Sequence, residues 1–280
     1  MKTATQIKAL VRNRAKAKNV EAETILRSFM MERFLERVSV SDYKDNFILK
    51  GGMLIAAIVG IETRTTMDVD ATIKGNALSQ AEAATFVENV LNVSVDDGVS
   101  FAVRSIEEIR DDVDYPGFRI SIEAVLEKTR QMLKVDITAG DFVTPRETEY
   151  RLPLMFEDRT ISIMAYNLET ILAEKLEAII SRGATTTRMR DFYDIYILTT
   201  TQVFDEATFY AALKKTAEKR GTILQMANLQ SVIQVIEENS LLKDHWQRYK
   251  KRFAYASNVS WEMTIEALRK LSQNLPEFPT

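Results

Sequence analysis

The stretch FILKGGMLIAAIVGIETRTTMDVDATI, residues 47–73, decides the fold. It opens with a short apolar run that is ended by Gly51 and Gly52, and a helix-like apolar segment follows at residues 53–59. Residues 67–73 then alternate strictly between apolar and polar side chains, which predicts a half-buried strand. One face of this strand carries Met67, Val69, Ala71 and Ile73, and the other carries Asp68, Asp70 and Thr72.

Two carboxylates on one face of a strand need a physical reason. Asp68 and Asp70 would lie about 7 Å apart along the strand, where like charges repel and each raises the pKa of the other. A divalent cation removes that penalty, and Mg²⁺ prefers carboxylate oxygens together with phosphate oxygens and water. Because Asp-x-Asp also occurs by chance in many proteins, the pair alone does not establish a metal site.

Two further features favour a site for a nucleoside triphosphate. The backbone amides of the Gly51–Gly52 turn could cradle phosphates. The segment LKVDI, residues 133–137, predicts another strand that carries Asp136 on its polar face. A third carboxylate on a neighbouring strand suits a site for two Mg²⁺ ions, in which the ions activate an attacking hydroxyl and steady the leaving pyrophosphate.

The character of the chain changes near residue 150. Before it, the pattern predicts one or two helices at 5–38, a helix at 77–93, and strands at 101–109, 118–126 and 132–138, of which the last two form a hairpin. After it, helices are predicted at 167–181, 188–200, 205–219, 222–239, 241–253 and 260–273. The order predicts an α+β fold, with a mixed sheet and helices in a domain at 1–150 and an all-α domain at 151–280.

Two charged residues of the helical half occupy faces that should be apolar. Lys175 falls in the middle of the apolar stripe of the helix at 167–181, and Asp191 shares the inward face of the next helix, with Asp194 three residues on. An unpaired buried charge is costly, so each residue needs a partner. Three interpretations of Lys175 stay open: its tip reaches solvent, it forms a structural ion pair with Asp191, or it binds an anionic substrate.

The same residues resemble the motifs of a known family. FILKGGML at residues 47–54 and RTTMDVD at 64–70 resemble the opening motif of the AbiEii/AbiGii toxin family of nucleotidyltransferase-like proteins. NLETILAEKLE at 167–177 and RDFYDIY at 190–196 resemble its later motifs, in the same order and at similar spacing. The resemblance implies a polymerase-β-type nucleotidyltransferase core followed by an all-α C-terminal half.

The resemblance also implies roles for individual residues. Asp68 and Asp70 would be catalytic metal ligands, and Asp136 would take the third carboxylate position. Lys175 and Asp191 would be the active-site lysine and the late catalytic aspartate. The residues expected at the nucleotide are Lys50, Gly51, Gly52, Arg64, Thr65 and Lys175.

The family implies a biological setting as well. Its members are toxins of bacterial toxin–antitoxin and phage-defence systems, and some transfer nucleotides to RNA, including the acceptor end of tRNA. The antitoxin is often a winged-helix regulator. We therefore expect Mg²⁺ as cofactor, a nucleoside triphosphate as substrate, an RNA acceptor and a cognate antitoxin. One departure is Gly52, which stands where many nucleotidyltransferases have serine and would leave the phosphate grip to backbone amides.

Composition limits the other possibilities. The 280 residues carry a net charge of −3, so RNA would have to bind through a local basic patch. The chain has no cysteine and a single histidine, His245, which excludes thiolate metal sites and argues against a Ser-His-Asp triad. The basic N-terminal segment lacks the apolar core of a signal peptide, and no apolar run is long enough for a bilayer. We therefore expect a cytoplasmic protein with no membrane partner.

Two basic clusters are candidates for RNA contact. The second lies beside Trp246, Tyr249 and Phe253, whose rings either stack on unpaired bases or are buried. The clusters are Arg12, Arg14, Lys16 and Lys18, and Lys243, Arg248, Lys250, Lys251 and Arg252. Three functions stay open: a toxin that modifies RNA, a nucleotidyltransferase for a small molecule of the antibiotic type, and a catalytically silent binding module with the same fold.

Overall fold

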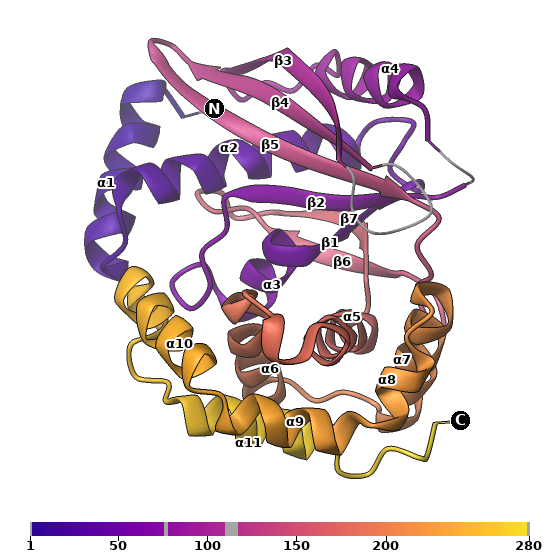
Figure 1. Ribbon diagram of the computed structural model, residues 1–280. Helices are drawn as coiled ribbons and strands as arrows, with labels where there is room; N and C mark the ends of the chain where they lie inside the picture. Colours follow the sequence, from indigo (N-terminus) through magenta and orange to yellow (C-terminus); the bar gives the residue numbers. More distant parts are fainter. Residues whose placement is uncertain (1, 76–77, 110–116, 279–280) are drawn as a thin grey trace. The chain divides into compact units, whose positions relative to one another are not determined.

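A computed structural model describes residues 2–75, 78–109 and 117–278 of the chain (Figure 1). The chain divides into two compact units, which we describe separately. The sheet unit comprises Met1–Asp141 and Glu147–Tyr166, and the helical unit comprises Phe142–Arg146 and Asn167–Thr280. The predicted fold class is confirmed, because a mixed sheet with helices is followed by a half that is helical throughout.

Seven strands of the described residues form one mixed sheet in the order β3-β4-β5-β2-β1-β7-β6 (Figure 1). β2 pairs parallel with β5 and β1 pairs parallel with β7, whereas the other neighbours are antiparallel. The elements of the sheet unit are α1 (Ala4–Lys18), α2 (Ala22–Ser39), β1 (Phe47–Lys50), α3 (Gly51–Val59), β2 (Asp68–Ile73), α4 (Gln80–Leu91), β3 (Val99–Ile109), β4 (Gly117–Leu126), β5 (Thr129–Ala139), β6 (Thr148–Pro153) and β7 (Thr160–Ala165).

Helices cover one face of the sheet and leave the other for polar side chains. Phe47 of β1 lies on the covered face, where its ring centroid is 6.3 Å from that of Phe34 in α2 and 5.8 Å from that of Phe86 in α4. Because β1 and β2 pair in register and side chains alternate along a strand, the buried apolar residues of β2 share this face. Asp68 and Asp70 therefore project from the opposite face, as the alternation predicts.

β6 and β7 are absent from the prediction from sequence. They form an antiparallel hairpin, and β7 joins β1, so the sheet extends to Ala165 and the predicted boundary at residue 150 falls within β6. β6 lies at the edge of the sheet and exposes most of its side chains, so Glu149 and Arg151 hide its alternation. Ile161 and Ile163 of β7 do alternate with polar residues and are buried, which is a usable period of two.

The helices of the helical unit lie close to their predicted positions. The predicted helix at 222–239 is divided at Asn228, whose side-chain amide donates to the Leu224 carbonyl at 3.0 Å. No helix of the described residues has both the length and the apolar character needed to cross a bilayer. The elements are α5 (Leu168–Arg182), η1 (Gly183–Thr185), α6 (Met189–Thr201), α7 (Glu206–Arg220), α8 (Ile223–Ala227), α9 (Leu229–Glu238), α10 (Ser240–Arg252), η2 (Ala254–Ala256) and α11 (Trp261–Ser272).

Candidate active site

Three carboxylates lie on the polar face of two adjacent strands in the sheet unit. β2 and β5 run parallel and in register, which places Asp70 directly beside Asp136 and Asp68 beside Lys134. The three aspartates are half-buried, whereas Lys134 is exposed. The sheet register thus brings together the carboxylates that the sequence places on two separate strands.

The electrostatics of this face disfavour a negative charge on Asp68. Burial raises the pKa of Asp68 above its ordinary value, and the charges of Asp70 and Asp136 raise it further. Lys134 and Arg119 lower it to a lesser extent. A divalent cation would relieve this repulsion, and a set of carboxylates without sulfur or imidazole suits a hard cation such as Mg²⁺.

Asp136 is already engaged by an arginine that the sequence analysis does not single out. Nε and Nη2 of Arg119 donate to Oδ1 and Oδ2 of Asp136 at 2.8 and 2.6 Å, and this bidentate contact raises the pKa of Arg119. Within the described residues, no three His, Cys, Asp or Glu side chains are placed to hold one metal ion. Both oxygens of Asp136 are engaged by Arg119, so Asp136 could bind a metal only after that contact is broken.

Replacing Arg119 tests whether Asp136 can serve as a metal ligand. Arg119→Gln removes a cation from the polar face and releases both oxygens of Asp136, so we expect the Mg²⁺ concentration for half-maximal nucleotide transfer to fall about tenfold. Arg130→Gln is the matched control, because Arg130 of β5 pairs with Glu123, which is not a predicted ligand. An unchanged or higher Mg²⁺ requirement in Arg119→Gln would remove Asp136 from the proposed ligands.

The first two residues of α3 lie very close to the carboxylate of Asp70. The amide of Gly52 donates to Oδ2 of Asp70 at 3.2 Å. Gly51 has a φ of +64°, and a Cβ built on it would lie 2.1 Å from the same oxygen. Only glycine combines this left-handed backbone with such an approach. The two glycines that the sequence assigns to the triphosphate therefore also fix where Asp70 lies.

Gly51→Ala should damage the site by displacing Asp70. We expect nucleotide transfer to fall about a hundredfold, because the added methyl group forces the carboxylate away from its position. Gly221→Ala is the matched control, since Gly221 has a φ of +65° but no atom lies within 4 Å of its Cβ position. The control should lose about 1 kcal/mol of stability, because alanine is strained in a left-handed backbone conformation, and it should keep its activity. Equal activity in the two variants would contradict the proposed position of Asp70.

Two neighbouring side chains leave no free space for a side chain at residue 52. A Cβ on Gly52 would lie 2.5 Å from Oγ1 of Thr66, which is too close, and 3.1 Å from Nη1 of Arg64, which is tight. Arg64 is 2% exposed, and its Nη1 donates to the Thr65 carbonyl at 2.6 Å. A serine in place of Gly52 would therefore have to displace the Thr66 hydroxyl.

Lys50 lies on the same polar face, opposite Asp70 in the register of β1 and β2. Its Nζ donates to Oγ1 of Thr138 at 2.9 Å and to Oδ2 of Asp141 at 2.6 Å. Neither of these two partners is predicted from the sequence. Thr138 could have been found, because it follows Asp136 by two residues on the same strand and so shares its face.

In the helical unit, Lys175 lies between two aspartates of α6. Its Nζ is 2.7 Å from Oδ1 of Asp191 and 2.7 Å from Oδ2 of Asp194, and Asp194 is fully buried. The ion pair is therefore present, and Asp194 extends it to a third group. Oδ2 of Asp191 is buried and accepts no hydrogen bond from the residues that the structure describes, which is a costly state for a carboxylate oxygen.

Two of the three aromatic residues near the C-terminal basic cluster, Trp246 and Tyr249, are part of the core. Trp246 is fully buried and donates from Nε1 to the Val259 carbonyl at 3.1 Å. Tyr249 is also buried, so neither ring is available to stack on a base. In the N-terminal cluster, Arg14 donates to the Met155 carbonyl at 3.3 Å and Lys18 pairs with Glu62 at 2.6 Å.

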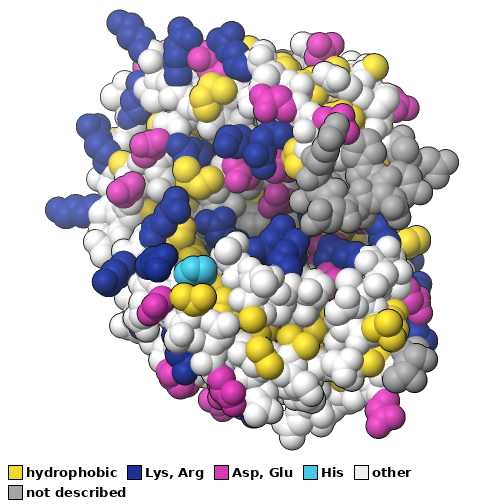
Figure 2. Space-filling view, viewed as in Figure 1, with side chains coloured by type: hydrophobic (Ala, Val, Ile, Leu, Met, Phe, Trp, Pro, Cys, Tyr) yellow, Lys and Arg dark blue, Asp and Glu magenta, His cyan; other side chains and the backbone are white. Residues whose placement is uncertain are grey.

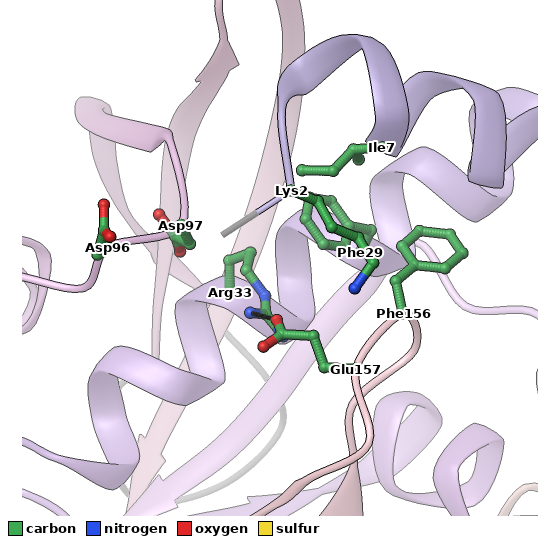
Figure 3. A pocket seen from close by; sticks show the side chains of 8 residues that line it. All are labelled: Lys2, Ile7, Phe29, Arg33, Asp96, Asp97, Phe156 and Glu157. Atoms are coloured by element: carbon green, nitrogen blue, oxygen red, sulfur yellow. Dashed lines mark hydrogen bonds and ion pairs between the residues drawn. The ribbon is translucent and has the colours of Figure 1, made fainter.

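A separate hollow of the sheet unit contains none of the predicted site residues. It has a volume of about 250 Å³, and Figure 3 shows Arg33 and Phe29 of α2 among the side chains that line it. Arg33 is 1% exposed and pairs with three carboxylates of the protein, those of Glu32, Glu36 and Glu157. Because the protein itself neutralises this arginine, we assign no ligand to the hollow.

Comparison with known proteins identifies relatives of the chain. The family model described as "Nucleotidyl transferase AbiEii toxin, Type IV TA system" matches residues 33–267. Among solved structures, JHP933 from Helicobacter pylori is similar over 90% of this chain and 91% of its own, with 15% identity and a TM-score of 0.53. A candidate nucleotidyltransferase from H. pylori aligns over 91% of this chain and 95% of its own, with 16% identity and a TM-score of 0.49.

An antigenic nucleotidyltransferase-like protein from Paracoccidioides brasiliensis aligns over 74% of this chain and 93% of its own, with 14% identity and a TM-score of 0.41. Among proteins with curated descriptions, none matches the chain. At 15% identity, the similarity to JHP933 supports the fold alone. The family match covers most of the chain and every motif that carries the resemblance. The protein therefore belongs to the AbiEii family of nucleotidyltransferase toxins of type IV toxin–antitoxin systems, and it is a nucleotidyltransferase.

Proposed function

We propose that the protein transfers a nucleotide from a nucleoside triphosphate to an RNA acceptor such as tRNA, in an Mg²⁺-dependent reaction that serves as the toxin of a toxin–antitoxin or phage-defence system. The observation that carries the proposal is the placing of Asp68, Asp70 and Asp136 on one face of adjacent strands, with the amide of Gly52 directed at Asp70. Such a face attracts a hard cation and, with it, a triphosphate.

Asp68 and Asp70 are the proposed metal ligands, and Asp136 joins them when Arg119 is displaced. Bound Mg²⁺ would neutralise charge on the triphosphate and favour ionisation of the attacking hydroxyl. In the proposed reaction the acceptor oxygen forms a bond to the α-phosphorus as pyrophosphate leaves, and the protein holds both reactants in line. The residues proposed to hold the nucleotide are Lys50, Gly51, Gly52, Arg64 and Thr65.

Catalytic roles for Lys175 and Asp191 are also proposed, on the strength of their motif. Lys175 would balance substrate charge, in addition to the charge of the aspartates that it pairs with. Oδ2 of Asp191 accepts no hydrogen bond within the described part of the chain, which supports a role as hydrogen-bond acceptor for the substrate.

Family membership implies an antitoxin partner. We propose that this partner is a winged-helix regulator and that the protein is cytoplasmic. Co-expression of the neighbouring gene tests this, because a cognate antitoxin should restore growth of cells that the toxin arrests.

The proposed reaction is tested by incubating the purified protein with Mg²⁺, each α-labelled nucleoside triphosphate in turn, and total bacterial RNA. We expect label in a discrete RNA band, for one nucleotide more than the others. Label that appears only in a small-molecule fraction of a cell extract would replace the RNA acceptor with a small molecule. No transfer to any acceptor under these conditions would favour a catalytically silent binding module.

A further inference from the structure

The helical unit contains a hollow that gathers positive charge. It has a volume of about 470 Å³ and lies between the start of α6 and one side of α10. Figure 2 shows dark blue Lys and Arg side chains gathered beside the cyan histidine on this view of the molecule. We call this feature the arginine hollow, and the side chains that define it are Arg188, Arg190, His245, Arg248, Arg252 and Phe253.

Among the described residues, the four arginines of the hollow form no ion pair with a carboxylate, unlike several other arginines of the protein. Arg119, Arg159 and Arg220, for example, each form an ion pair with an Asp or Glu. In residues 2–75, 78–109 and 117–278, no ion pair involves any arginine of the hollow. Asp191 follows Arg190 directly in the sequence, but its carboxylate pairs with Lys175, at 2.7 Å. The positive charge of the hollow is therefore not neutralised by an ion pair within the described part of the chain.

Stacking on one ring holds two of these guanidinium groups in place. Cζ of Arg190 lies 5.4 Å from the centre of the Phe253 ring, and Cζ of Arg252 lies 5.3 Å from it. Arg248 precedes Arg252 by one helical turn and so shares its side of α10. A guanidinium that rests on a ring keeps its in-plane N–H donors for another acceptor, so the hollow presents donors as well as charge.

We infer that the arginine hollow binds the phosphodiester backbone of the RNA acceptor, an inference that rests on the proposed function. Arginine donors match phosphate oxygens in a two-point contact, and backbone phosphates offer a continuous row of such anions. Because the whole chain carries a net charge of −3, its overall field does not attract RNA and a local cluster has to do so. The contact is made by the arginines, since the neighbouring rings of Trp246 and Tyr249 are buried.

The test is the affinity of the full-length protein for fluorescently end-labelled total bacterial tRNA, measured by anisotropy over a range of salt concentrations. For Arg248→Gln/Arg252→Gln we expect affinity to fall about tenfold, and the slope of log affinity against log salt to decrease by about two. Arg269→Gln/Lys270→Gln is the matched control, because it removes two exposed charges of α11 that already pair with glutamates. Arg248→Lys/Arg252→Lys keeps the charge and should retain most of the salt slope. This variant therefore distinguishes a loss of binding caused by the missing charge from one caused by misfolding.

If the wild type and the Gln double variant have the same tRNA affinity and the same salt slope, the inference is overturned. This is also the result expected if the hollow binds an acidic protein and not RNA. The proposed function is judged separately, by label transfer. If the wild type labels RNA while the Gln double variant binds it normally, the inference fails and the proposed function stands. If arginine-dependent tRNA binding occurs without any label transfer, the inference stands and the proposed function fails.

Discussion

We expect nucleotide transfer by Asp68→Asn to fall about a thousandfold or more, which corresponds to roughly 4 kcal/mol in the activation barrier. The expected loss is large because the amide keeps the shape of the side chain but removes the charge that a hard cation would require. The same change should leave the fold as stable as the wild type or more stable. Burial and the neighbouring Asp70 and Asp136 raise the pKa of Asp68, so its ionised form opposes folding at neutral pH and a neutral side chain removes that cost.

Transfer rate and thermal unfolding midpoint, measured on the same preparations, check both parts of this prediction. Asp158→Asn is the control, because Asp158 is exposed in the turn between β6 and β7. The proposed ligands lie on other strands, β2 and β5. The control should match the wild type in both measurements. A destabilised Asp68→Asn would contradict the electrostatic argument, and an active one would contradict the catalytic role.

We expect Lys175→Met to lower the free energy of unfolding by about 3 kcal/mol, because it removes the ammonium group that pairs with two buried carboxylates. Lys175 Nζ is 2.7 Å from an oxygen of each of two aspartates, and Asp194 has no exposed surface with which to recover hydration. For a protein of this size the loss corresponds to a fall of roughly 6–12 °C in Tm. Chemical or thermal denaturation of the purified variant measures it directly.

Two comparisons separate a broken ion pair from a general loss of packing. Lys214→Met removes an exposed lysine of α7 that lies 4.0 Å from Glu218, so it should cost less than about 0.5 kcal/mol. Lys175→Met/Asp194→Asn should recover a large part of the stability lost in the single variant, since one of the orphaned charges is gone. Additive losses in the double variant would show that Lys175 does not stabilise the fold through Asp194.

The polar face of the sheet could be predicted because a strand has a fixed period of two. The alternation at residues 67–73 determines the faces of Asp68 and Asp70, and the same rule places Asp136 on the polar face of its own strand. The helices of the C-terminal half could also be predicted from the sequence, since apolar stripes and caps recur along it. The ion pair of Lys175 with Asp191 is one of the interpretations that the sequence leaves open, and the structure selects it as a contact.

The remaining features depend on pairing that no local pattern fixes. The hairpin of β6 and β7 lies at a sheet edge where exposed charges hide the alternation. The contact of Arg119 with Asp136 follows from the register of β4 and β5, in which the two residues are direct partners. The predicted strands ended at residue 126 and began again at 132, so the predicted hairpin did not contain the turn at residues 127–128 that sets this register. The arginine hollow joins two helices that are distant in sequence, and only the folded chain brings its charges together.

Metal specificity of Asp68→Cys tests most directly whether the carboxylates of β2 hold the catalytic cation. The chain has no other cysteine, so the new thiol is unique. A thiolate favours a soft cation such as Cd²⁺ over Mg²⁺. The account predicts that Asp68→Cys loses about a thousandfold in transfer with Mg²⁺ and regains about tenfold or more when Cd²⁺ is added, whereas Asp68→Ala regains nothing. Full transfer by Asp68→Ala with Mg²⁺ alone would contradict it.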